Sequence, residues 1–168
     1  MAADLRRSLL PHIVHGKRPV SSAVYGTVSV VAIVAVSAHE NQSAGRVLAF
    51  ATVSMSVIWA VHVYASTLEH TGPHNLAWRG ALALALREEF GVIEGALAPL
   101  LVLLLGAIGF IEDQRAIVLA MWSGVVLLML MPFVWLRRSG ASVGECVVAS
   151  CVAGLLGLVL ILFKILVH

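Results

Sequence analysis

Five long apolar runs constrain the fold of this chain more than any other feature of its sequence. They lie at about residues 20–38, 47–68, 91–111, 116–136 and 143–167, with short polar breaks between them. A helix rises 1.5 Å per residue, so about 20 apolar residues cross the ~30 Å hydrocarbon core of a bilayer. Lipid offers no hydrogen-bond partner to the peptide groups, so such runs must form helices. The runs therefore predict an all-α integral membrane protein with five transmembrane helices.

The composition agrees with this class of protein. Hydrophobic residues make up 60% of the 168 residues and charged residues 12%, whereas soluble domains have about 45–50% and about 25%. We expect a single membrane domain over residues 1–168. No small-residue cleavage site follows the first apolar run, so we interpret that run as a retained span. The net charge of +2 is too small to indicate binding to nucleic acid.

The distribution of lysine and arginine predicts the orientation in the membrane. With the N-terminus inside, eight of the 11 basic residues are cytoplasmic: Arg6, Arg7, Lys17, Arg18, Arg79, Arg87, Arg137 and Arg138. Arg46, Arg115 and Lys164 are then on the outer side. Because cytoplasmic segments carry the excess of positive charge, we expect a cytoplasmic N-terminus and an outside C-terminus. The expected location is a plasma membrane of bacterial type.

The longest connection joins the second and third spans. Gly72 and Pro73 interrupt the helix, and Asn75 is a suitable cap for the next one. The stretch 76–89 predicts a short interfacial helix, or one that bends into the third span. His70 and His74 are four residues apart, but the intervening Gly-Pro forbids a helical metal site, so we interpret them as part of a turn.

Polar side chains from four different spans fall at a similar expected depth. Tyr25, His62, Glu94 and Glu145 all lie within about 3–10 Å of the inner boundary when each span is measured from its cytoplasmic end. An ionisable group inside a span is costly, and each one is a hypothesis for a functional site. The shared depth predicts a polar cluster in the inner leaflet, provided that these side chains face one another.

Such a cluster has two chemical uses. His62 with Glu94 and Glu145 could hold a divalent metal ion, the only cofactor that we consider, or His62 could carry a proton. Ser66 and Met55 lie on the same edge of the second span as His62, and they could line a transport path or form hydrogen bonds. The alternatives are structural: a hydrogen-bonded His62, a packed Met55, and glutamates that favour the positive ends of their helices.

The last span carries small residues at helical spacing, namely Cys146, Ser150, Gly154 and Gly157. Such a stripe allows close packing of helices, within the chain or between copies, and we expect a homo-oligomer in the lipid bilayer. The spacing of Cys146 and Cys151 fits neither a redox pair nor a zinc site, so we interpret both as packing residues.

No motif of a soluble enzyme is present, since the sequence lacks GxSxG, a P-loop, HExxH and a dinucleotide fingerprint. We therefore expect a protein that is not an enzyme. The first functional hypothesis is a small transporter, or a channel-like protein, that moves a cation, either a divalent metal or a proton-linked ion. The second is a membrane subunit or scaffold that does not transport and that packs with a partner protein or with itself. A membrane enzyme acting on lipid or quinone would need the same polar cluster.

The layout of the spans resembles the vacuolar iron transporter family. Three stretches are similar to parts of that family: YGTVSVVAIV from Tyr25, SVIWAVHVYAS ending at Ser66, and PLLVLLLGAIGF from Pro99. The resemblance covers about residues 20–167 and implies five spans with a cytoplasmic N-terminus and transport of a metal ion.

The family's metal-binding carboxylates are missing from this chain. The aspartate of its first span falls on Tyr25, and the glutamate of its second span falls on Val63. The methionine of the second span falls near Trp59, and only Glu88 and Glu89 remain of the acidic connector. The resemblance therefore implies a transport site that is lost, or one that is rebuilt around another residue such as His62.

Overall fold

The computed structural model describes residues 20–38, 42–71 and 77–167, with side chains between residues 21 and 162. Every regular element in this part of the chain is a helix. The helices are α2 (Val20–Ser37), α3 (Ala44–Thr71), α4 (Trp78–Glu88), α5 (Phe90–Ala107), α6 (Asp113–Arg138) and α7 (Val143–Val167). The prediction of an all-helical chain is confirmed for the described residues.

Several of these helices are compatible with insertion into a membrane. By length and apolar character, four helical segments could cross one: α3, α4 together with α5 (Trp78–Ala107), α6, and Val143–Leu162 of α7. The apolar helix α2 is shorter. A helix lies at each of the five ranges expected as spans.

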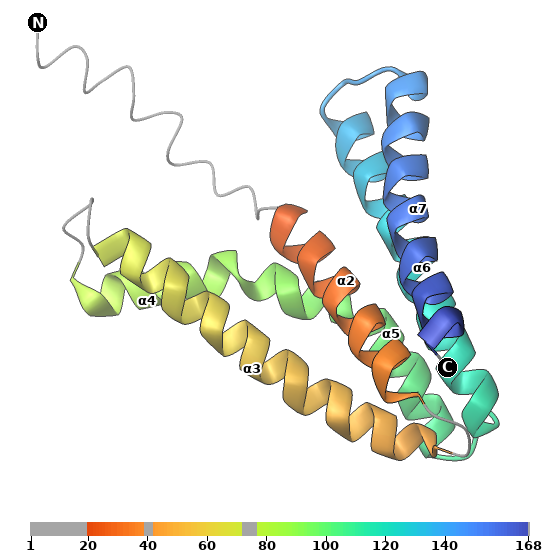
Figure 1. Cartoon of the computed structure of the whole chain (residues 1–168). Coiled ribbons are helices and arrows are strands. Elements are labelled where there is room, and N and C mark those ends of the chain that lie inside the picture. The colour runs from red at the N-terminus through yellow and green to blue at the C-terminus, as the bar shows by residue number, and fades with distance from the viewer. Residues whose placement is uncertain (1–19, 39–41, 72–76, 168) are drawn as a thin grey trace, which may run out of the picture.

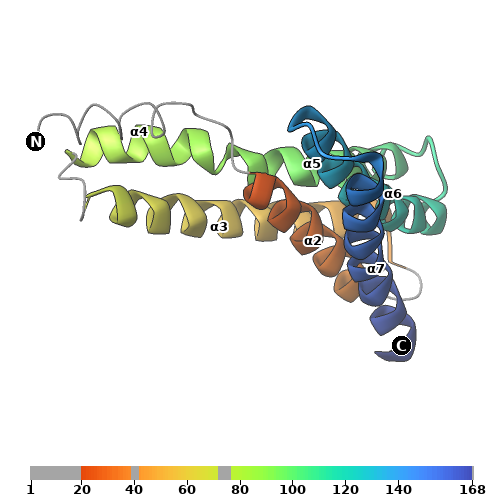
Figure 2. The same cartoon turned by 90° about the horizontal axis from the view of Figure 1, so that it is seen from above.

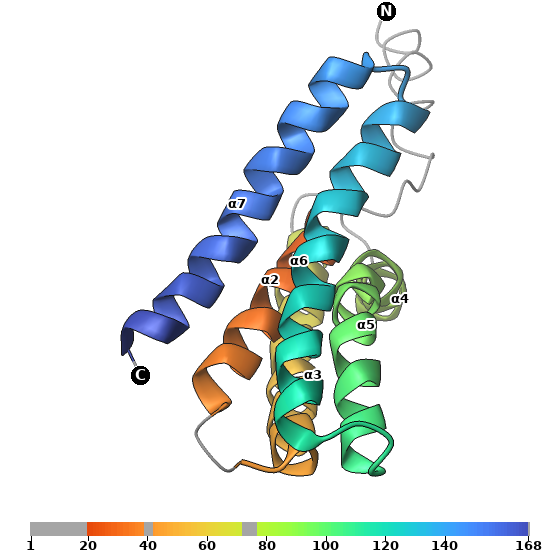
Figure 3. The same ribbon diagram turned by 90° about the vertical axis from the view of Figure 1, so that its right-hand side faces the viewer.

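Helices α2, α5 and α6 form the middle of the bundle. The most extensive contacts join α2 to α5, α5 to α6, and α6 to α7, while α3 packs against α5 and α4. Figure 1 shows α3 and α4 side by side at one edge and α6 with α7 at the other. Figures 2 and 3 confirm that α7 lies on the opposite side of the molecule from the α3–α4 pair.

Three glycines allow α2 and α5 to cross in backbone contact. A Cβ atom at Gly26 would meet the backbone of Val92, and one at Gly95 would meet the carbonyl oxygen of Ala23. A Cβ atom at Gly91 would likewise meet the hydroxyl of Ser22. Small residues permit this close approach of helix axes, which is the usual way for helices to pack inside a membrane.

A shared hydroxyl joins the same two helices beside the glycines. Thr27 is fully buried, and its Oγ1 lies 2.9 Å from the carbonyl oxygens of both Ala23 in α2 and Gly95 in α5. The single hydroxyl hydrogen of Thr27 therefore satisfies a carbonyl of its own helix and one of its neighbour. Since the backbone of α5 is this close, Thr27 fixes the register of the crossing as well as its distance.

Two glycines end helices with the same backbone motif. Gly109 and Gly140 have φ angles of +80° and +85°, which other residues rarely adopt. After α5, the N–H of Gly109 donates to Gly106 O and that of Phe110 to Leu105 O, at 2.9 and 3.0 Å. After α6, Gly140 and Ala141 repeat this pattern. Both ends are Schellman motifs, which satisfy the last carbonyl groups and reverse the chain.

The connection between α3 and α5 differs from the expected turn. Helix α3 continues through Thr71, so His70 is helical and the prediction that it lies in a turn is wrong. His74 lies outside the described residues. The expected helix at 76–89 is α4, which packs along α3 and continues into α5 after a break at Glu89. Figure 1 shows the chain changing direction at this break.

The glycine crossing predicts a clear difference between two Gly→Ala variants. Gly26→Ala places a methyl group against the backbone of Val92, which cannot move aside as a side chain can. Overpacking of this kind costs about 1–3 kcal/mol of unfolding free energy. Gly80 in α4 has open space around it, so Gly80→Ala should instead stabilise the helix by up to about 1 kcal/mol.

Unfolding in detergent, followed by circular dichroism, measures both effects. Equal stabilities of Gly26→Ala and the parent would show that α2 and α5 do not touch in the way described.

Candidate functional site

His62 is the centre of the polar cluster, and α2 supplies its first neighbour. The ring of Tyr25 lies 4.6 Å from the ring of His62, centroid to centroid, with the two planes tilted by 48°. Tyr25 directly precedes Gly26, so the close approach of α2 to α5 also sets the position of this ring along the bundle. Two of the side chains that the sequence placed at one depth are therefore in contact.

The third member of the cluster is Glu89, at the break between α4 and α5. Its Oε2 lies 3.5 Å from Nδ1 of His62, and 15% of the Glu89 side chain is exposed compared with 35% of the imidazole. A neutral ring that directs Nδ1–H toward this carboxylate keeps Nε2 as its proton-accepting atom. The pair can therefore gain a proton on the imidazole without losing its mutual contact.

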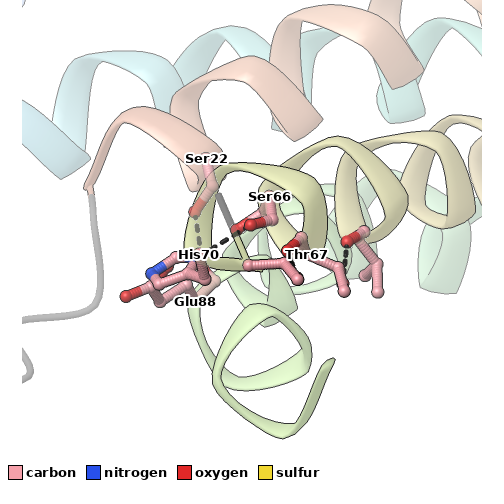
Figure 4. A network of polar contacts seen from close by, with 7 residues as sticks. Ser22, Ser66, Thr67, His70 and Glu88 are labelled. Carbon is pink, nitrogen blue, oxygen red and sulfur yellow. Dashed lines mark hydrogen bonds and ion pairs between the residues drawn. The ribbon is translucent and has the colours of Figure 1, made fainter. Parts of the chain in front are cut away.

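A second histidine–glutamate pair lies two turns further along α3. His70 Nε2 is 3.4 Å from Oε2 of Glu88, and His70 Nδ1 is 2.7 Å from the carbonyl oxygen of Ser66. The hydroxyl of Ser22 in α2 donates to the backbone carbonyl of Glu88 at 3.3 Å. Figure 4 shows these residues meeting where α2, α3 and α4 come together.

The last turns of α3 are stiffened by side chains that bond to their own helix. The hydroxyls of Thr67 and Thr71 each donate at 2.6 Å to the carbonyl four residues earlier, as the ring of His70 also does. Because the ring of His70 bonds to its own helix through Nδ1, its other nitrogen, Nε2, is directed toward Glu88 of α4.

The other residues predicted for the second span have structural positions. Met55 is buried and belongs to the hydrophobic core cluster, which agrees with packing rather than with a soft metal ligand. Ser66 is also buried, and its backbone carbonyl rather than its hydroxyl makes the contact with His70.

The two predicted carboxylate ligands, Glu145 and Glu94, have different surroundings. Glu145 is exposed in the first turn of α7, where its Oε2 accepts hydrogen bonds from the backbone N–H and the hydroxyl of Ser142, each at 2.9 Å. The N–H of Glu145 donates in turn to the Ser142 hydroxyl, which completes a capping box. Glu94 is half-buried in α5 and has polar contacts of its own.

The arrangement bears directly on metal binding. Within residues 20–38, 42–71 and 77–167, no group of three or more His, Cys, Asp or Glu side chains is placed to hold a metal ion. Glu145 lies in the first turn of α7, where its carboxylate bonds to Ser142. His62, Glu94 and Glu145, the predicted metal ligands, are therefore not gathered into one such group among the described residues.

Sequence reasoning missed Glu88 and Glu89 as partners of the histidines. It placed them only at the end of a connector, because helical rotation and the bend at Glu89 cannot be read from depth alone. Two consecutive acids just before an apolar run, opposite two histidines eight residues apart, are the signal that could have found them.

One further polar group lies near His62 on α3, toward the start of that helix. The indole N–H of Trp59, one turn from His62, is buried and has no acceptor among the described residues. Nearer the start of α3, residues of α2 and α3 belong to the buried hydrophobic core cluster, including Val30, Val34 and Ala51.

Comparison of this chain with protein families, with curated proteins and with solved structures finds no match. The resemblance to the vacuolar iron transporters stays a prediction.

The capping box at the start of α7 predicts a local effect of Glu145. Replacing it with alanine removes the acceptor of two hydrogen bonds from Ser142, so the first turn of α7 should open more often. Hydrogen exchange of the backbone amides at residues 142–149 should become faster, while the rest of the bundle is unchanged.

Glu69→Ala is the matched control, because Glu69 is also an exposed acid on a helix. If the two variants affected residues 142–149 equally, the cap would have no role there.

Proposed function

We propose that the protein is a small membrane transporter that moves a cation in a proton-linked manner, with His62 as the group that gains and loses the proton. In this proposal Glu89 supplies the counter-charge and Tyr25 holds the ring from the side of α2. The N-terminus is cytoplasmic, the C-terminus is outside, and the site faces the inner leaflet of a plasma membrane of bacterial type.

The observation that carries the proposal is the contact of His62 with Glu89. An imidazole changes its charge between about pH 5 and 8, which suits reversible proton transfer under physiological conditions. Beside a carboxylate at 3.5 Å, the charged ring is compensated at a depth where a lone charge would be costly. Both side chains are partly exposed, the imidazole more than the carboxylate, so neither is enclosed by the bundle.

The excess of negative charge near His62 indicates that the species moved with the proton is a cation. His62 carries at most one positive charge, while Glu89 and the neighbouring Glu88 and Glu94 supply negative charge around the beginning of α5. This excess of carboxylates favours a cation over an anion as the transported species. A divalent metal ion is one such species, although it would need ligands beyond the histidine and the single carboxylate in contact with it.

A membrane subunit that does not transport is the second candidate, and two observations favour it. Apolar residues of α2, α3, α5 and α6 pack together in one core cluster, which is what a subunit that does not transport requires. In addition, an apolar hollow of about 290 Å³ lies between α6 and α7, lined by Val126, Met129, Leu130, Phe133 and Ser150. The Ser150 hydroxyl is buried there with no partner among the described residues. A helix of a partner protein could fill this hollow.

Flux through reconstituted protein tests the first candidate. In proteoliposomes with an internal pH-sensitive dye, an imposed cation gradient should drive proton movement in the parent. His62→Ala should reduce this flux to the level of protein-free liposomes, because no other described group has the same contact with Glu89. Glu89→Gln should reduce it as well, while Glu145→Gln should leave it unchanged, because Glu145 caps a distant helix.

A parallel assay in proteoliposomes with a metal-sensitive dye compares the flux of divalent ions through the parent and through Glu94→Gln. If parent and His62→Ala moved protons and metal ions equally, the assignment of His62 would be wrong.

Purification tests the second candidate. A subunit that does not transport should co-purify in mild detergent with one partner at fixed stoichiometry. The Ser150→Leu variant, whose larger side chain fills the hollow, should lose that partner. Recovery of the parent as an unaccompanied protein with proton flux would exclude this function.

A further inference from the structure

The contact between His70 and Glu88 depends on how many protons the two side chains hold, which is not true of the contact between His62 and Glu89. Carbonyl oxygens only accept hydrogen bonds, so the 2.7 Å contact between Nδ1 of His70 and the Ser66 carbonyl requires a hydrogen on Nδ1. In a neutral imidazole the other nitrogen, Nε2, then carries a lone pair and no hydrogen. That atom faces Oε2 of Glu88 at 3.4 Å.

One further proton decides whether this contact attracts or repels. With the imidazole doubly protonated, Nε2–H faces a carboxylate, which is a charge-assisted pair. With a neutral carboxyl group on Glu88, the O–H donates to Nε2 instead. When neither group holds the proton, a lone pair faces a carboxylate oxygen, and the two atoms repel each other.

His62 does not share this property. Its Nδ1 faces Glu89, so the neutral ring can still donate to the carboxylate and need not be charged for the contact to hold. The two histidines of α3 therefore differ in what they require of the proton, although each has a glutamate at a similar distance. The difference follows from the carbonyl of Ser66, which occupies one ring nitrogen of His70 alone.

Glu88 lies where three helices meet, so the effect of this proton extends beyond one pair. Its side chain is held by α3 through His70, and its backbone carbonyl accepts the hydrogen bond from Ser22 of α2. It is the last residue of α4, directly before the break at Glu89. Losing the contact with His70 would remove the polar contact that joins the last residue of α4 to the end of α3 (Figure 4), and would leave only the packing between the two helices to hold them there.

Other charged groups lie on α3 and on the elements packed against it, and two of the acids among them have partners other than His70. The elements packed against α3 carry these described titratable or charged residues: Tyr25 on α2, Arg79, Arg87 and Glu88 on α4, Glu89 at the joint, Glu94 on α5, and Asp113, Arg115, Arg137 and Arg138 at the ends of α6. On α3 itself are Arg46, His62, Tyr64 and Glu69. Glu89 pairs with His62, and Asp113 bonds the backbone N–H of Ala44 at the opposite end of α3.

We propose that His70 and Glu88 form a proton-dependent lock, which holds α4 against the end of α3 when one proton is shared between Nε2 and Oε2 and releases α4 when that proton is lost. The lock is regulatory and does not depend on the transport proposed above. It closes as the pH falls and opens as the pH rises, because the closed form is the protonated one.

Distances between spin labels on α3 and α4 test the lock in the full-length protein. The labels are attached through Ala49→Cys on the exposed face of α3 and Gly80→Cys on α4, where the surroundings are open. Cys146 and Cys151 are replaced by alanine so that no other thiol reacts. Measurements in nanodiscs at about pH 5.5 and about pH 8.5 bracket the range over which histidine titrates.

The labelled parent should give one narrow distance distribution at low pH and a broader distribution with a different mean at high pH. Glu88→Gln is the decisive variant, because its amide can donate to the neutral ring or accept from the charged one, so the narrow distribution should persist at both values. His70→Ala should give the broad distribution at both. Glu69→Gln, which removes the same charge from an exposed site, should behave as the parent does.

A parent distribution that does not change with pH would overturn the lock. A pH-dependent change of full size in Glu88→Gln or in His70→Ala would also overturn it. Because none of these readouts involves transport, the lock can fail while the proposed function stands, and the reverse also holds.

Discussion

Helices α2 and α5 touch backbone to backbone because Gly26, Gly91 and Gly95 leave no side chain between them. The rest of the polar cluster depends on this approach. Ser22 and Tyr25 lie on the turn of α2 next to the crossing, and Glu88 and Glu89 directly precede α5. The glycines therefore bring these side chains of α2 close enough to reach the joint between α4 and α5 and the ring of His62.

Two consecutive glutamates serve histidines that are eight residues, or about 12 Å, apart on α3. Glu88 and Glu89 must therefore diverge along α3, which the break between α4 and α5 permits. The two pairs have the same composition, yet only one has a carbonyl on the second ring nitrogen. The carbonyl oxygen of Ser66 thus occupies Nδ1 of His70 and leaves Nε2 to face its glutamate, whereas His62 faces its glutamate with Nδ1.

The helical ranges could be predicted because each apolar run is about as long as a membrane is thick. The length of a run can be read from the sequence however the helices pack against one another. A structural role for Glu145 at the positive end of its helix was one of the alternatives, and the structure adds Ser142 as its partner in a capping box. The contact of Tyr25 with His62 agrees with the shared depth. The contacts of Glu89 and His70 were not predicted, because they depend on helical rotation, on the break in α4–α5, and on how far α3 continues.

The length of α3 has a consequence for the proposed lock. Its 28 residues span about 42 Å, which exceeds the ~30 Å hydrocarbon thickness even at the usual tilt of about 20°. The proposed orientation assigns the excess of about two turns to the end of α3 that packs against α4, so that His70 would lie past the acyl chains and His62 near the boundary. A membrane that separates an acidic compartment from an alkaline one would thus expose His70 to one of them alone. The proposed lock would then report the acidity of that single compartment.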